Sequence, residues 1–179
     1  MEYNNVQIKW YGHDTFTLQH NGLVICIDPY QLEKKIIADL ILVSHNHFDH
    51  LSNVDLQKIS SEKTIIVAAK ECLDQIKVTS KQIIGIEPNE EKIISGIKIK
   101  AIAAYNLDKI NPETKKPFHP KEDKKIGFLL TINNSTFYHA GDSDHIPEMN
   151  NLSPDVFFVP VSGTRSEEHT SELQSPCNL

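Results

Sequence analysis

Short apolar runs, separated by turn-forming residues, recur along most of the 179-residue chain. Runs of four to eight apolar or alternating residues are typical of strands that are buried on one or both faces. They predict strands at residues 6–10, 15–19, 23–28, 40–44, 64–69, 82–87, 125–133, 136–139 and 155–161, and a hairpin broken by Gly96 at residues 93–104. Asn21-Gly22 predicts a tight hairpin turn, and residues 133–135 join a second pair of strands. Helices are expected at residues 52–59, capped by Ser52 or Asn53, and at residues 70–76.

This pattern of many strands with helices between them favours an α/β fold with two sheets. The chain shows no internal repeat and no linker-like stretch, so we expect one domain over residues 1–163. Periodicity alone does not separate this architecture from other α/β folds.

Composition and charge narrow the function classes. Hydrophobic residues make up 39% and charged residues 23% of the chain, as in an ordinary soluble globular protein. The net charge of −6 argues against nucleic acid as a partner. Residues 1–5 resemble no signal peptide, and no apolar stretch approaches the roughly 20 residues of a membrane span. The spacing of Cys26, Cys72 and Cys177 does not suggest a disulfide scaffold, which favours a reducing cytoplasm.

Four residues of the kind that bind metals follow the predicted strand at 40–44. They are His45, His47, Asp49 and His50. Residues two apart in extended chain share a face, so the first two histidines can point the same way, and the last two residues come where the chain must turn. Imidazole nitrogens with a carboxylate suit Zn²⁺, or another first-row ion such as Mn²⁺ or Fe²⁺. A single histidine is usually a core or surface residue, but four ligands within six positions predict a metal site.

His-x-His-x-Asp-His after a hydrophobic strand resembles the signature of the metallo-β-lactamase superfamily. Further motifs in the expected order support the resemblance: Gly12-His13-Asp14-Thr15-Phe16, Ile27-Asp28-Pro29, Ala104-Tyr105-Asn106, Phe118-His119-Pro120 and residues 138–144. Together they resemble small metal-dependent hydrolases related to ascorbate-phosphate lactonases and N-acyl-phosphatidylethanolamine phospholipase D. The resemblance runs from about Val6 to Gly163 and implies an αββα two-sheet sandwich, incomplete at the C-terminus.

The resemblance also implies a site for two Zn²⁺ ions. His45 and His47 would help to hold one ion, Asp49 and His50 the other, and Asp142 would bridge them. Around these ligands it implies supporting or pocket-lining roles for His13, Asp28 and His139. The third histidine of the first site is replaced by Asn106, which is a poor zinc ligand. His119 is expected to take that place, and the alternative is a histidine on a surface loop.

The chemistry expected of such a centre is hydrolysis of a small ester, lactone or phosphoester by a metal-bound hydroxide. Asp49 and His50 are the candidate catalytic residues, and Asp49 is able to assist proton transfer. Two alternatives remain open: a metal-binding regulatory module without turnover, which Asn106 favours, and a phosphodiesterase or nuclease, which the acidic charge disfavours. The expected partner is a small-molecule substrate, and the sequence does not predict an oligomeric state.

Residues 106–124 form a long polar segment, and such a loop within a compact domain is often functional. It is either a solvated surface loop or a lid whose lysines attract an anionic substrate.

The last residues do not continue the family pattern. Residues 165–175 resemble the translation of a short-read sequencing adapter, so we expect residues 164–179 to be a non-native tail. The resemblance would place a final strand and one more metal-binding histidine beyond Gly163, and His169 is not expected to be that ligand.

Overall fold

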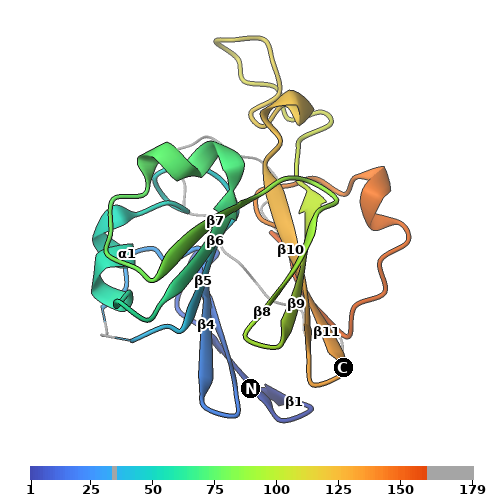
Figure 1. Ribbon diagram of the computed structural model, residues 1–179. Helices are drawn as coiled ribbons and strands as arrows, with labels where there is room; N and C mark the ends of the chain where they lie inside the picture. Colours follow the sequence, from blue (N-terminus) through green and yellow to red (C-terminus); the bar gives the residue numbers. More distant parts are fainter. Residues whose placement is uncertain (34–35, 161–179) are drawn as a thin grey trace. The chain divides into compact units, whose positions relative to one another are not determined.

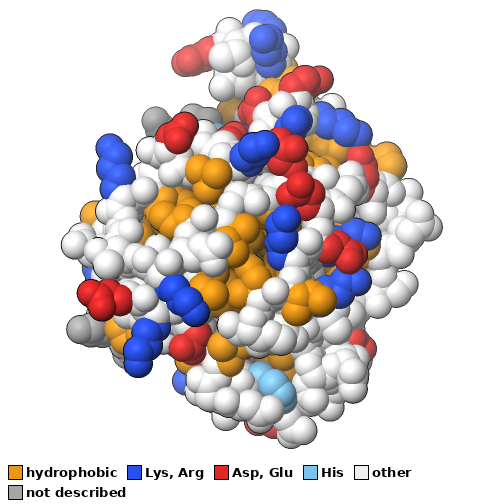
Figure 2. All heavy atoms as spheres, viewed as in Figure 1, with side chains coloured by type: hydrophobic (Ala, Val, Ile, Leu, Met, Phe, Trp, Pro, Cys, Tyr) orange, Lys and Arg blue, Asp and Glu red, His pale blue; other side chains and the backbone are white. Residues whose placement is uncertain are grey.

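The computed structural model describes residues 1–33 and 36–160, and the tail predicted to be non-native lies outside them. The chain forms two compact units, residues 1–86 and the part from residue 87 onward, and each unit contains its own sheet (Figure 1). Within the described ranges no helix combines the length and apolar character needed to cross a bilayer. Acidic and basic side chains are interspersed over the face drawn in Figure 2.

The first unit contains a seven-stranded sheet whose strands follow one another in chain order. The strands are β1 (Glu2–Tyr3), β2 (Val6–Trp10), β3 (Phe16–His20), β4 (Leu23–Ile27), β5 (Leu40–Val43), β6 (Ile65–Ala69) and β7 (Gln82–Ile86). Pairing is antiparallel from β1 to β4 and parallel from β4 to β7. The parallel connections carry a short α-helix, α1 (Asn53–Ile59), and a 3₁₀ helix, η1 (Lys70–Gln75).

The parallel strands position the candidate site. β5 and most of β4 and β6 are buried, which explains their continuous apolar runs, because a parallel strand covered on both faces does not alternate. Since β4 and β5 run in the same direction, their carboxyl ends lie at the same edge of the sheet. Asp28 follows β4 and Ser44 follows β5, and the Asp28 N–H donates to the Leu42 carbonyl at 2.9 Å. This edge therefore brings together two segments that are 16 positions apart.

The second unit contains a five-stranded sheet in the order β12-β11-β10-β9-β8. Its strands are β8 (Glu91–Ile94), β9 (Ile97–Ala103), β10 (Ile126–Ile132), β11 (Ser135–His139) and β12 (Val156–Phe158), with 3₁₀ helices η2 (Lys121–Asp123) and η3 (Pro147–Met149). All neighbours are antiparallel except β11 and β12. A Cβ atom added at Gly127 would lie 2.5 Å from the His139 carbonyl oxygen, so only glycine permits this close approach of β10 to the end of β11.

The tight turns agree with the residues that the sequence offers. Asn21 and Gly22 have φ of 48° and 82°, and Ser95 and Gly96 have φ of 51° and 80°. Two successive positive φ angles are typical of the type I′ turn, whose twist matches that of paired strands. The Asn21-Gly22 hairpin is thereby confirmed. The predicted three-residue connection at 133–135 is shorter, because Ser135 already belongs to β11.

Three other expectations differ from the structure. β1 was not predicted, because two residues carry no periodicity. Residues 70–75 form a 3₁₀ helix rather than an α-helix, in keeping with a short return between two parallel strands. The strand predicted at 155–161 covers only Val156–Phe158 within the described residues.

The Asp55 side chain links α1, through hydrogen bonds, to the chain segment that follows β4. Its side chain is 5% exposed and accepts hydrogen bonds from the Gln31 and Leu32 N–H groups, the Ser52 hydroxyl and the Lys58 ammonium. Burial by itself raises the pKa of Asp55, but these hydrogen bonds outweigh it and hold the pKa below 3.8. The folded protein therefore binds a proton at Asp55 less readily than the unfolded chain does.

We expect Asp55→Asn to lower the free energy of unfolding at pH 7 by about 1.5–3 kcal/mol, because hydrogen bonds to a charged group are lost. A depressed pKa stabilises the fold above the unfolded value and loses that effect as pH falls through the folded value. The deficit of the variant should therefore shrink as pH falls below about 4. Urea unfolding at several pH values checks this, with the exposed Asp74→Asn as control, and a deficit independent of pH would contradict it.

Candidate metal centre

The segment after β5 forms a compact ligand loop, residues 44–50. The N–H groups of His50 and Leu51 both donate to the His47 carbonyl, at 3.0 and 2.8 Å, so the chain turns back after the second histidine. The His45, Asp49 and His50 residues are buried, at 1%, 6% and 0% exposed. The ring centroid of His45 lies 4.7 Å from that of His47 and 3.9 Å from that of His50. The loop thus gathers its three histidines.

Asp28 and Ser44 orient two of these rings. The Asp28 carboxylate accepts from the Ser44 N–H at 2.7 Å and from the Ser44 hydroxyl at 2.6 Å, and it lies 2.8 Å from His50 Nδ1. A carboxylate only accepts, so His50 carries its proton on Nδ1. The Ser44 hydroxyl donates its hydrogen to the bond with Asp28, so its oxygen accepts from His45 Nδ1 at 3.0 Å. Both rings therefore present Nε2 with its lone pair, the form in which a histidine binds a metal.

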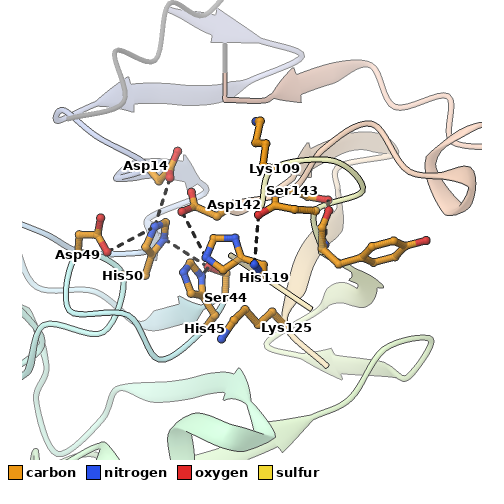
Figure 3. Close-up of polar contacts among 12 residues, drawn as sticks. Asp14, Ser44, His45, Asp49, His50, Lys109, His119, Lys125, Asp142 and Ser143 are labelled. Carbon is orange, nitrogen blue, oxygen red and sulfur yellow. Dashed lines mark hydrogen bonds and ion pairs between the residues drawn. The ribbon is translucent and has the colours of Figure 1, made fainter. Parts of the chain in front are cut away.

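A second group of side chains in the first unit lies around His50. His50 Nε2 lies 3.5 Å from Asp14 Oδ2 and 3.9 Å from Asp49 Oδ1, and His13 Nε2 lies 3.1 Å from Asp49 Oδ2. Figure 3 draws both Asp14 and Asp49 joined to the His50 ring by dashed lines. Ligands bound tetrahedrally at zinc–ligand lengths of about 2.0–2.2 Å lie roughly 3.3–3.6 Å apart. Buried imidazole and carboxylate groups at these separations fit a first-row metal ion.

The second unit contributes His119 and Asp142. His119 Nε2 lies 3.9 Å from Asp142 Oδ2 (Figure 3), and both side chains are buried, at 5% and 8% exposed. Asp142 follows Gly141, which has a φ of 59°. The Gly141 N–H donates to His139 Nδ1 at 3.2 Å, so His139 fixes the turn that carries the aspartate. His139 is 2% exposed, and this hydrogen bond agrees with the supporting role that the resemblance implies for it.

Asn106 holds the backbone of His119. Its N–H donates to the His119 carbonyl at 2.9 Å, and its side-chain oxygen accepts from the His119 N–H at 3.2 Å. Both residues are buried, and the two hydrogen bonds close the loop of residues 107–118 at its base. Asn106 stands where the resemblance implies a metal-binding histidine. It therefore holds the backbone of His119, the residue expected to act as ligand instead.

We expect Asn106→Ala to weaken Zn²⁺ binding about 10-fold, because loss of a partner that orients a ligand typically costs 10–100-fold and the backbone hydrogen bond remains. Zinc titration against a chromophoric chelator measures the effect.

The control for this variant is Asn111→Ala, which lies inside the same loop and away from its base. The Asn111 side chain accepts from the Glu113 and Thr114 N–H groups, the same kind of contact without a neighbouring ligand. Equal zinc affinity in the Asn106 and Asn111 variants would show that the hydrogen bond from the His119 N–H to the Asn106 side chain does not matter for zinc binding.

Three more carboxylates hold the polar segment 106–124 in place. Asp144 accepts from the Leu107 N–H at 2.9 Å and pairs with Lys109 at 2.8 Å. Glu148 pairs with Lys121 at 2.7 Å and accepts from the Tyr105 hydroxyl at 2.9 Å. The Lys121 ammonium holds the pKa of Glu148 below its usual value. Lys124 pairs with Glu87 as well, so three of the loop lysines are matched by carboxylates and attract an anion less than their number suggests.

Two residues of these clusters were not named as site residues from the sequence. Ser44 directly precedes the first ligand histidine, and Asp14 lies beside His13 in the same motif. In the sequence, only their position next to a candidate ligand marks these two residues. Their contacts could not be predicted from it, because they depend on how β3, β4 and β5 pair. His13 and Asp28 lie beside the loop ligands, and His119 and Asp142 lie together in the second unit.

Comparison with known proteins identifies the family. A family described as beta-lactamase superfamily domain matches residues 7–176. A UPF0173 protein of Pyrococcus abyssi is 27% identical, covering 94% of this chain and 77% of its own length. A UPF0173 metal-dependent hydrolase of Thermoplasma acidophilum is 28% identical, covering 89% of this chain and 72% of its own. The solved structure of a proposed metal-dependent hydrolase from Parabacteroides distasonis is 27% identical, with a TM-score of 0.77 over 90% of this chain and 73% of the other.

These findings agree with the motif and with the element content. The family match covers most of the chain, and two mixed sheets with few helices are consistent with the α/β sandwich of that family. The fold class and the family predicted from His-x-His-x-Asp-His are confirmed. The chain belongs to the metallo-β-lactamase superfamily, among relatives and structural neighbours named as metal-dependent hydrolases.

Proposed function

We propose that this metal-dependent hydrolase cleaves a small ester, lactone or phosphoester at a centre of two Zn²⁺ ions, with Mn²⁺ or Fe²⁺ as alternatives. The ligands in the proposal are His45, His47, Asp49, His50, His119 and Asp142. The observation that carries it is the buried pair of histidines, His45 and His50, whose Nε2 lone pairs are set by the Ser44–Asp28 network.

In this mechanism the residues of the chain position and exchange protons. These residues would hold a first-row metal ion, which would lower the pKa of a water molecule to near neutral and so make that water a nucleophile. Asp28 and Ser44 keep the two histidines in the binding tautomer. Asp49, buried beside His50, is the proposed acceptor and donor of the proton during turnover. We also propose a reducing, cytoplasmic setting, which the buried free thiols Cys26 and Cys72 support.

Two other functions were open from the sequence. A module without turnover was favoured by Asn106 in place of a histidine, but that residue has an alternative use in holding His119. A nuclease needs a basic surface, whereas the net charge is −6 and the face in Figure 2 mixes both signs. The hydrolase of small substrates is therefore the better supported function.

The proposal is tested by loading the protein separately with Zn²⁺, Mn²⁺ and Fe²⁺ and assaying three substrates. These are p-nitrophenyl acetate, a γ-lactone and p-nitrophenyl phosphate. We expect two bound ions and turnover of at least one substrate that a chelator abolishes. Metal binding without turnover would favour the regulatory module. Hydrolysis of RNA or of bis-p-nitrophenyl phosphate at a matching rate would favour the phosphodiesterase or nuclease.

A further inference from the structure

His13 has a buried imidazole ring and is not among the ligands proposed above. Its side chain is 6% exposed. Within residues 1–33 and 36–160 neither ring nitrogen has a partner with hydrogen-bond geometry, although Nε2 lies 3.1 Å from Asp49 Oδ2. A buried polar group without a hydrogen bond costs about 1–3 kcal/mol. Another interaction is therefore needed to satisfy this ring.

The backbone holds the ring in place at a conformational cost. His13 has a φ of 49°, a left-handed conformation that is uncommon outside glycine. The Thr15 N–H donates to the Gly12 carbonyl at 3.0 Å, and the Trp10 indole N–H donates to the His13 carbonyl at 2.8 Å. Non-glycine residues held in this region cluster at functional sites.

We infer that His13 is a metal ligand, which with Asp49 and His50 holds one ion within residues 1–86. One ligand atom from each of the three residues lies within 4.8 Å of the others. Asp28 fixes the proton of His50 on Nδ1, so Nε2 is available to that ion. The inference rests on the proposed function only in assuming that the chain binds metal.

If His13 binds the metal, the ion should also affect the stability of the protein against unfolding. His13 and His50 come from segments far apart in sequence, so a shared ion cross-links the turn to the ligand loop. Binding to the folded state alone raises the apparent stability. Metal should therefore protect the protein against unfolding less well when His13 is replaced.

The test uses His13→Gly in the full chain, because glycine accepts a φ of 49° without strain. Co²⁺ is the probe, followed by its visible absorption and by equilibrium dialysis. We expect the wild type to bind two ions and the variant to bind one of them at least about 100-fold more weakly, since loss of an orienting partner alone costs 10–100-fold. Added imidazole should restore the lost absorption by entering the space left by the ring. His13→Asn, which also tolerates positive φ, guards against misfolding of the glycine variant.

The outcomes separate this inference from the proposed function. Wild-type affinity and cobalt spectrum in both variants, with hydrolysis intact in the wild type, would overturn the ligand role of His13 and leave the function standing. Absence of metal binding by the wild type would overturn both. A weakened site that imidazole does not restore in folded His13→Gly would also contradict direct ligation.

Discussion

His45→Ala and Asp49→Ala are each expected to lose bound metal and to reduce hydrolysis at least about 100-fold, because even the loss of a group that only orients a ligand costs 10–100-fold. The two variants remove different ligands, an imidazole oriented by Ser44 and a carboxylate beside His13 and His50. The fold should survive, since the ligand loop follows β5 rather than forming the apolar core. Metal analysis after dialysis, with circular dichroism, makes the measurement.

His20→Ala is the control for these variants. Its ring lies at the end of β3 and contacts the Asn5 carbonyl at 2.9 Å, apart from the ligand loop. The control should keep the metal content of the wild type. Unchanged metal content in both ligand variants would refute the assignment of the loop.

The parts of the fold that the sequence predicted are those with a local signal. The apolar run at 40–44 marks β5 because a strand buried on both faces needs no alternation. Asn21-Gly22 marks its hairpin because the turn needs two positive φ angles. The four loop ligands were visible for the same reason, since their spacing is contained in six positions.

Contacts between distant segments were predicted only through the resemblance, or not at all. The place of Asp28 beside His50 depends on the parallel pairing of β4 with β5. Asn106 looked like a defect in the ligand set, and only its hydrogen bonds with His119 show what it does. Lysines at 109, 121 and 124 suggested a positive lid, but their carboxylate partners lie up to 37 positions away. The non-native origin of residues 164–179 stays a prediction, and the family match extends to residue 176.

Asp28→Asn tests the network that orients the ligands, and we expect it to weaken Zn²⁺ binding about 10–100-fold. The carboxylate is fully buried and serves three donors, the Ser44 N–H, the Ser44 hydroxyl and His50 Nδ1. Asparagine has one acceptor oxygen, so its NH₂ group must face either the Ser44 N–H or the Ser44 hydroxyl and His50. The second orientation moves the His50 proton to Nε2 and removes the lone pair that would bind metal. The first leaves a buried N–H unsatisfied, at about 1–3 kcal/mol of stability.

Backbone strain does not confound this substitution, because Asp28 has a φ of 43° and asparagine tolerates that region as well as aspartate does. The matched control is Asp155→Asn, whose carboxylate accepts from the Thr136 N–H and hydroxyl at 2.7 and 2.8 Å but serves no ligand. Zinc titration should separate the two variants, and ¹⁵N NMR of the imidazoles should report the tautomers of His45 and His50. If Asp28→Asn binds zinc as tightly as Asp155→Asn with both tautomers unchanged, the orienting role of Asp28 is wrong.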